Sequence, residues 1–263
     1  MSDTAADPLA DAAFGRTPQR WPLPAAAGPR TRWLRAVAAG GQGHYAVACT
    51  ELDALLRATR DPVLHSLAHS TRASFIRQLG GHTAARGWDG RAAAAAGDDP
   101  EACADALTGL AADALGVGRF AASARLLDRA ADAAAAAGGR APVRLAWVRA
   151  ELAMARGDGT AAVAHAEQGV RLAEDFGSAR HRVKSQVVLA AAWCAAGELD
   201  RARAVADAAL PLTERFGLVP LRWALACLLG DIGSDLQVPE RVAAIRDHAA
   251  DTVRQRGGAW STR

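Results

Sequence analysis

Residues 183–200 have the sequence VKSQVVLAAAWCAAGELD, and residues 201–216 continue with a second pattern of spaced apolar positions. Ala and Leu are strong helix formers, whereas Gly197 allows the chain a tight turn without a steric penalty. The stretch 178–217 therefore predicts two helices joined by a short turn. The rest of the chain follows the same plan.

The same skeleton occurs 40 residues upstream, and the matched positions are Gly157 and Gly197, Ala162 and Ala202, Leu172 and Leu212, Glu174 and Glu214, and Phe176-Gly177 and Phe216-Gly217. Further turn glycines extend the series toward the N-terminus. Successive spacings are 37, 38, 39 and 40 residues across Gly43, Gly80, Gly118, Gly157 and Gly197. A fixed period of this length is the signature of a helical repeat array.

A small residue follows each turn glycine by five positions, at Ala48, Ala85, Ser123, Ala162 and Ala202. This pattern resembles the tetratricopeptide repeat, in which a small residue lets the two helices of a pair approach closely. Ala130 and Ala209 match the second small position of that family, and Trp193 matches its first-helix aromatic. Two departures are the longer period, against about 34 in the family, and Leu189-Ala190 in place of a Leu-Gly pair. Longer-period arrays resemble the sensor or scaffold arms of bacterial transcriptional regulators.

We expect an all-α fold: a right-handed superhelical array of about five helix-turn-helix repeats across residues 30–256, as an α-solenoid. Hydrophobic residues make up 51% of the chain but aromatics only 5%, because Ala supplies most of the apolar count, which favours helix. Helix starts are marked by Asp61-Pro62 and Asp99-Pro100, since a capping side chain followed by proline suits the first turn. Pro142 begins the fourth pair, and 219–230 with 239–256 form a C-terminal helical cap.

The two ends are expected to be tails. Residues 1–29 are rich in Pro and Ala, which favours disorder; alternatively, Trp21 and Leu23 dock as an extended segment. Residues 257–263 form the second tail. We find no basic region followed by an apolar core at the start of the chain, and no apolar run near the ~20 residues of a membrane span. A cytoplasmic protein with no membrane partner follows, its four widely spaced cysteines free.

Charge and motifs exclude several classes of function. The chain has 31 basic and 28 acidic residues, net +3, which is too balanced for a general nucleic-acid surface. His65 and His69 have the spacing of a zinc helix but lack the Glu and a third ligand. We find no phosphate-cradling loop and no nucleophile elbow. The prediction is therefore a non-enzyme with no metal and no cofactor, of unknown oligomeric state.

The resemblance implies that the first helices of successive pairs line a concave groove. Taking each turn glycine as a common origin places Asp105 on that face and predicts these partner-binding residues: Ser70, Ser74, Arg77, Arg144, Trp147, Glu151 and Lys184. Three further cations, Arg140, Arg180 and Arg182, stand at helix starts, where the positive end of the dipole repels them. They mark a possible anion-binding edge.

Two hypotheses for the function remain open. The first is a protein-interaction scaffold or adaptor that grips a peptide or helix of a partner, possibly acidic, in its groove. The second is a regulatory sensor that binds a small anionic ligand or nucleic acid at the basic edge. An open groove favours the first hypothesis, whereas a closed pocket favours a small molecule. The serine stripe Ser66, Ser70 and Ser74 either admits a partner or packs on the next helix.

Overall fold

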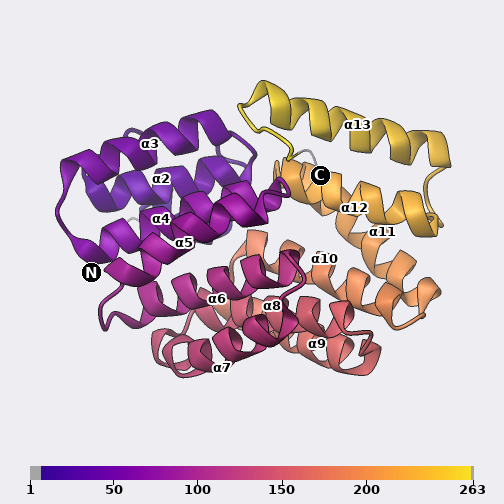
Figure 1. Ribbon diagram of the computed structural model, residues 1–263. Coiled ribbons are helices and arrows are strands. Elements are labelled where there is room, and N and C mark those ends of the chain that lie inside the picture. Colours follow the sequence, from indigo (N-terminus) through magenta and orange to yellow (C-terminus); the bar gives the residue numbers. More distant parts are fainter. Residues whose placement is uncertain (1–6, 262–263) are drawn as a thin grey trace, which may run out of the picture.

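The computed structural model describes residues 7–261, which form thirteen α-helices and no strand (Figure 1). The helices are α1 (Pro8–Phe14), α2 (Pro29–Gly41), α3 (Tyr45–Ala58), α4 (Pro62–Gln78), α5 (His82–Ala95), α6 (Pro100–Gly116), α7 (Phe120–Ala137), α8 (Arg140–Ala155), α9 (Gly159–Phe176), α10 (Ala179–Ala195), α11 (Leu199–Arg215), α12 (Val219–Ile232) and α13 (Pro239–Gln255). The expected all-α class is confirmed.

From α2 onward the helices pack in consecutive pairs, α2 with α3 through α12 with α13. The first helices of the pairs also contact one another in series, from α2 through α4, α6, α8 and α10 to α12. They form an inner layer, and the second helices form an outer layer. This arrangement is consistent with a helical repeat array.

The turn glycines and the small residues that follow them do what the sequence predicts. All five glycines have positive φ, from 75° at Gly118 to 89° at Gly80, a region where a side chain would be strained. The five small residues, Ala48, Ala85, Ser123, Ala162 and Ala202, are each 0% exposed. Each second helix therefore approaches its partner through a position with no room for a larger side chain.

The helix starts follow local chemistry. The side chains of Asp61 and Asp99 accept hydrogen bonds from backbone N–H groups of α4 and α6, and each is followed by proline. The fourth pair differs from the expectation, because α8 begins at Arg140 rather than at Pro142. Pro142 still lies in the first turn, where its missing N–H costs no hydrogen bond.

The chain ends differ from the two expected tails. Residues 8–14 form α1, with Leu9, Ala12 and Ala13 buried, and Leu23 is 6% exposed in the extended segment that follows. This region matches the alternative expectation of a docked extended segment, since the Trp21 ring stacks on the His44 ring with centroids 3.7 Å apart. Residues 1–6 and 262–263 lie outside the described residues.

The array closes on itself through its C-terminal end. The backbone N–H of Ala46 donates to the carbonyl of Arg256 at 3.0 Å, and that of Ser261 donates to Leu79 at 2.8 Å. Figure 1 shows the yellow C-terminal part of the chain beside the violet N-terminal helices. Trp260 packs against the apolar cluster of the first two pairs. Residues 257–261 thus join the last pair to the first.

The apolar interior is distributed along the array rather than gathered at one centre. Separate clusters join α1 to α4, α6 to α8, α8 to α10, and α10 to α13, as expected where each pair packs mainly on its neighbours. Among residues 7–261, none of the helices combines the length and apolar character that crossing a membrane requires.

Candidate functional site

The inner helices of the array surround a partly open cavity of about 280 Å³. Its walls come from the inner helices α2, α4, α6, α8, α10 and α12, together with Phe14 at the end of α1 and Trp260 in the C-terminal segment. The volume is just below the ~300–1,000 Å³ typical of ligand sites. It brings together Ser70, Ser74, Arg140, Arg144, Trp147, Arg180 and Lys184 from the predicted site.

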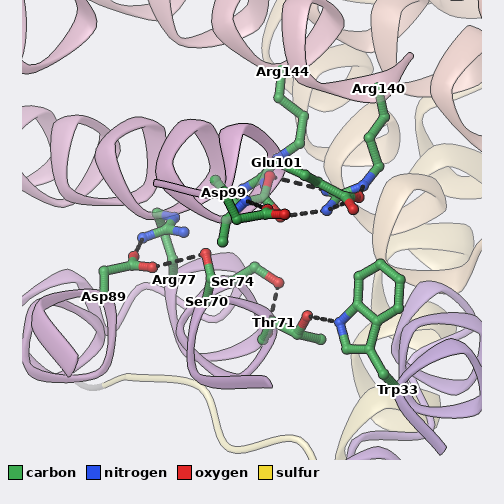
Figure 2. A network of polar contacts seen from close by, with 12 residues as sticks. Trp33, Ser70, Thr71, Ser74, Arg77, Asp89, Asp99, Glu101, Arg140 and Arg144 are labelled. Carbon is green, nitrogen blue, oxygen red and sulfur yellow. Dashed lines mark hydrogen bonds and ion pairs between the residues drawn. The ribbon is translucent and has the colours of Figure 1, made fainter. Parts of the chain in front are cut away.

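Arg140 and Arg144 of α8 share one carboxylate of α6. Both guanidiniums donate to Asp105, and Arg140 also pairs with Glu101 at 2.9 Å (Figure 2). Burial would raise the pKa of Asp105, but the two guanidiniums overcome it and hold that pKa below the usual range. The repulsion expected at the start of α8 is thus partly compensated from the neighbouring helix.

Arg180 of α10 has no carboxylate partner among the described residues. Its Nη1 donates to the backbone carbonyl of Val37 at 3.3 Å. Gly41 leaves the space that Arg180 occupies, since a Cβ there would lie 3.0 Å from the guanidinium. Burial, with repulsion from Arg140 and Arg144, lowers the pKa of Arg180 to about 10. This half-buried cation is held by a neutral carbonyl and by the Phe14 ring, whose centroid lies 5.8 Å from the guanidinium carbon.

Aromatic rings surround the cations. His181 stacks on Trp147 with centroids 5.4 Å apart, and Phe14 lies 6.1 Å from His181. Burial, and then the charge of Arg180, lower the pKa of His181 well below its ordinary value, so the ring is neutral near pH 7. Lys184 Nζ lies 5.9 Å from the Trp147 ring and 3.4 Å from Glu151.

The face of α4 that lines the cavity carries hydroxyl groups. Thr71 accepts a hydrogen bond from the Trp33 indole N–H at 2.9 Å, and Ser74 donates to the carbonyl of Thr71 at 2.7 Å. Ser70 donates to Asp89. Figure 2 shows these side chains on one stretch of α4, with Arg140 and Arg144 reaching toward Glu101 from the other side.

Three of the predicted residues are not among those that line the cavity. Arg77 is held between Asp89, at 2.7 Å, and Asp113. Arg182 has a side chain 38% exposed and pairs with Glu174 at 3.7 Å. Glu151 is the partner of Lys184.

Two residues of the serine stripe, Ser66 and Ser70, pack on the next helix, which was one of the two alternatives for this stripe. Ser66 donates to the carbonyl of Ala92 at 2.8 Å, and Ser70 donates to Asp89 at 3.1 Å; both acceptors belong to α5. His65 and His69 stand 6.3 Å apart between ring centroids. No group of three or more His, Cys, Asp or Glu side chains within residues 7–261 could hold a metal ion.

Several lining residues were not selected by the repeat pattern. The rings of Trp223 and Trp260 are in contact, tilted by 39° with centroids 4.2 Å apart, and Tyr45 and Phe75 lie edge to face at 5.4 Å. Phe14 and Trp260 belong to the chain ends, which have no repeat register, so no spacing could have found them. Tyr45 and Trp223 lie in regular helices, so aligning the sequences of all six helix pairs could have found them.

No model of a known protein family matches the chain, and a search of curated proteins gives no match either.

Proposed function

We propose that this protein is a non-catalytic sensor module that binds a small organic anion, a carboxylate or a phosphate, in the cavity between its inner helices. The observation that carries the proposal is the charge of the lining. Among the described residues that line the cavity, the cations are Arg140, Arg144, Arg180 and Lys184, and the only carboxylate is Asp105.

The energetic argument rests on Arg180. Removing a charge from water without a charged partner costs on the order of several kcal/mol per ion. Arg180 is half-buried, and its contacts are a hydrogen bond to a neutral carbonyl and the Phe14 ring at 5.8 Å, so no carboxylate offsets the part of that cost that it bears. A bound anion would supply charge-assisted hydrogen bonds, which are roughly twice as strong as neutral ones. Ionisable groups with a strongly shifted pKa in a concave site are typical of functional sites.

The scaffold hypothesis has less support. Residues 8–23 and 257–261 already pack against the inner helices and so occupy part of the inner face that a partner helix would need. We further propose that the array is tetratricopeptide-like and right-handed, with about five repeats and a helical cap, and that the protein acts in a bacterial cytoplasm. The period of 37–40 residues and the buried small residues support the repeat assignment.

Thermal unfolding with a panel of anions tests the proposal. A ligand that binds only the folded state stabilises it by about 2.7 kcal/mol at a hundred times Kd. We would measure Tm with acetate, benzoate, phosphate and phenyl phosphate, each at constant ionic strength balanced with chloride. At least one organic anion is expected to raise Tm of the native protein.

A matched pair of variants locates the effect. Arg180→Gln removes the lining cation, whereas Arg182→Gln removes a cation two positions along the same helix whose side chain is 38% exposed and paired with Glu174. The rise in Tm should persist in Arg182→Gln and vanish in Arg180→Gln. An equal rise in both variants, or no rise with any anion, would overturn the proposed function.

A further inference from the structure

The walls of the cavity differ in chemistry. α8 and α10 contribute cations, whereas the lining residues of α12 are all apolar: Pro220, Leu221, Trp223 and Ala224. The C-terminal segment adds Trp260, which contacts Trp223 with ring centroids 4.2 Å apart. One wall is therefore suited to an anion and another to an apolar group.

The face of α4 shows the same change along its length. Its lining residues are Ser70, Thr71 and Ser74 in the middle of the helix and Phe75 and Gln78 toward its C-terminal end, and Leu79 follows as the C-cap. At 1.5 Å of rise per residue, Ser70 and Leu79 lie about 13 Å apart along the axis. Phe75 is 5% and Leu79 is 8% exposed. Over that length the lining changes from three hydroxyl groups to two apolar side chains and one amide, Gln78, which is already paired with the Tyr45 hydroxyl.

The apolar wall contains one polar group without a partner. The indole N–H of Trp260 is buried and makes no hydrogen bond with any described residue. The indole of Trp147, by contrast, donates to Ser185 at 2.8 Å, and that of Trp33 donates to Thr71. A buried donor left unpaired is unfavourable relative to a paired one, so a hydrogen-bond acceptor that reached Trp260 would satisfy it.

The size of the cavity limits the ligand. At ~30 Å³ for each atom of the size of a water molecule, a volume of about 280 Å³ holds on the order of ten non-hydrogen atoms. A single carboxylate has three. Most atoms of such a ligand would then belong to its uncharged part rather than to its anionic group.

We propose that the ligand is an amphiphilic organic acid: an anionic head at Arg180 and Lys184, an apolar body against Trp223, and one hydrogen-bond acceptor near the N–H of Trp260. This inference rests on the proposed function and names the ligand class of the same site. Each part of the ligand matches one part of the cavity lining in charge or polarity. The charge sets the orientation, and the body supplies most of the affinity.

Calorimetric titration with a homologous series tests the proposal. The series runs from acetate through butanoate and hexanoate to octanoate, with 1-octanol as the neutral analogue and 8-hydroxyoctanoate as the analogue with a far acceptor. Affinity should rise roughly fourfold for each added methylene, which follows from about 0.8 kcal/mol per buried methylene. Octanoate should bind at least tenfold more tightly than 1-octanol.

Two variants test the far end. Trp260→Phe removes the N–H but keeps an aromatic ring, so 8-hydroxyoctanoate should bind severalfold more tightly than octanoate to the native protein and equally to the variant. Trp193→Phe is the matched control, because Trp193 contacts Arg201 at 4.6 Å and is not among the residues that line the cavity. It should retain the native preference.

The outcomes separate the two proposals. Inorganic phosphate or acetate binding as tightly as octanoate would overturn the amphiphilic ligand and leave the anion-binding function intact. Tight binding of 1-octanol with no gain from charge would overturn both, whereas no binding by any member of the series would overturn the amphiphilic ligand alone. A preference for 8-hydroxyoctanoate that survives in Trp260→Phe would remove the acceptor from the proposal.

Discussion

The guanidinium of Arg256 donates a 2.7 Å hydrogen bond to the backbone carbonyl of Gln42, although the two residues are 214 positions apart in the chain. Gln42 in turn donates to the carbonyls of Pro18 and Arg20. Both ends of the chain therefore meet at the end of α2. Contacts of this range couple the first pair directly to the last, which an open array does not do.

Removing residues 257–263 should weaken that coupling. Loss of the Trp260 contacts with Trp223 and the first-pair cluster is expected to cost roughly 2–3 kcal/mol, the scale for a large apolar side chain. Urea unfolding followed by circular dichroism and by tryptophan fluorescence would measure this. The two transitions should separate in the truncated protein, since the end pairs lose their mutual support.

A surface control accompanies the truncation. Leu236 is 71% exposed, so Leu236→Ala should change stability by less than about 0.5 kcal/mol. A truncated protein as stable as this control, with coincident transitions, would contradict the coupling role of residues 257–261.

Ala202→Leu should destabilise the fifth pair. The side chain of Ala202 is 0% exposed, and extra methylenes in a packed interior cost about 1–3 kcal/mol. Ala204 lies on the same helix but is exposed, so Ala204→Leu is the matched control and should be nearly neutral. Chemical unfolding of both variants would compare them; equal stabilities would refute the proposed close approach of α10 and α11.

The sequence predicted the helices well because their signals are local. Turn glycines, capping aspartates and buried small residues each act within one pair, and α4 and α6 begin where Asp61-Pro62 and Asp99-Pro100 predict. Closure of the array was not predictable, because it depends on residues 257–261 and on α1, where no period applies. The curvature that brings Arg256 to Gln42 accumulates over all the pairs.

The site was predicted in part for the same reason. A common origin at the turn glycines placed Ser70, Trp147 and Lys184 on the inner face, since every pair has the same geometry. It placed Arg77 there too, but that side chain turns to Asp89 and Asp113. A buried ion cluster depends on acidic residues from two other helices, which no spacing within α4 reveals.

The Arg77 cluster should make stability depend on pH. It places one guanidinium between two buried carboxylates, and burial raises the pKa of Asp89 to about 7 and raises that of Asp113. The folded protein thus keeps a proton that the unfolded chain, with an ordinary aspartate pKa near 3.8, releases. Its stabilising contribution is complete below about pH 4 and is lost as pH rises through about 7.

Comparison with Asp89→Asn isolates this effect, because the amide resembles the protonated carboxyl. His181 acts in the opposite sense, because its lowered pKa favours unfolding as pH falls below about 6.5. This contribution is the same in the native protein and in Asp89→Asn, so it cancels in their comparison. From pH 5 to 8 the native protein should lose stability relative to the variant by up to about 1.4 kcal/mol per pH unit. If the free energies of unfolding of the two proteins in urea differ by the same amount at every pH, the Arg77 cluster does not hold the extra proton.

Arg180→Gln should raise the stability of the ligand-free protein while it abolishes anion binding. The variant removes a desolvated cation whose neighbours Arg140 and Arg144 repel it, and it keeps a donor on the wall next to Val37. Relief of that cost is expected to add roughly 1–3 kcal/mol to the free energy of unfolding. Arg182→Gln, at a more exposed and paired position, should change stability by less than about 0.5 kcal/mol. Chemical unfolding without added anion, in chloride buffer, measures both. A residue that only supports the fold would lose stability on substitution, so a destabilised Arg180→Gln would assign Arg180 to the packing of α10 on α2 and not to a ligand.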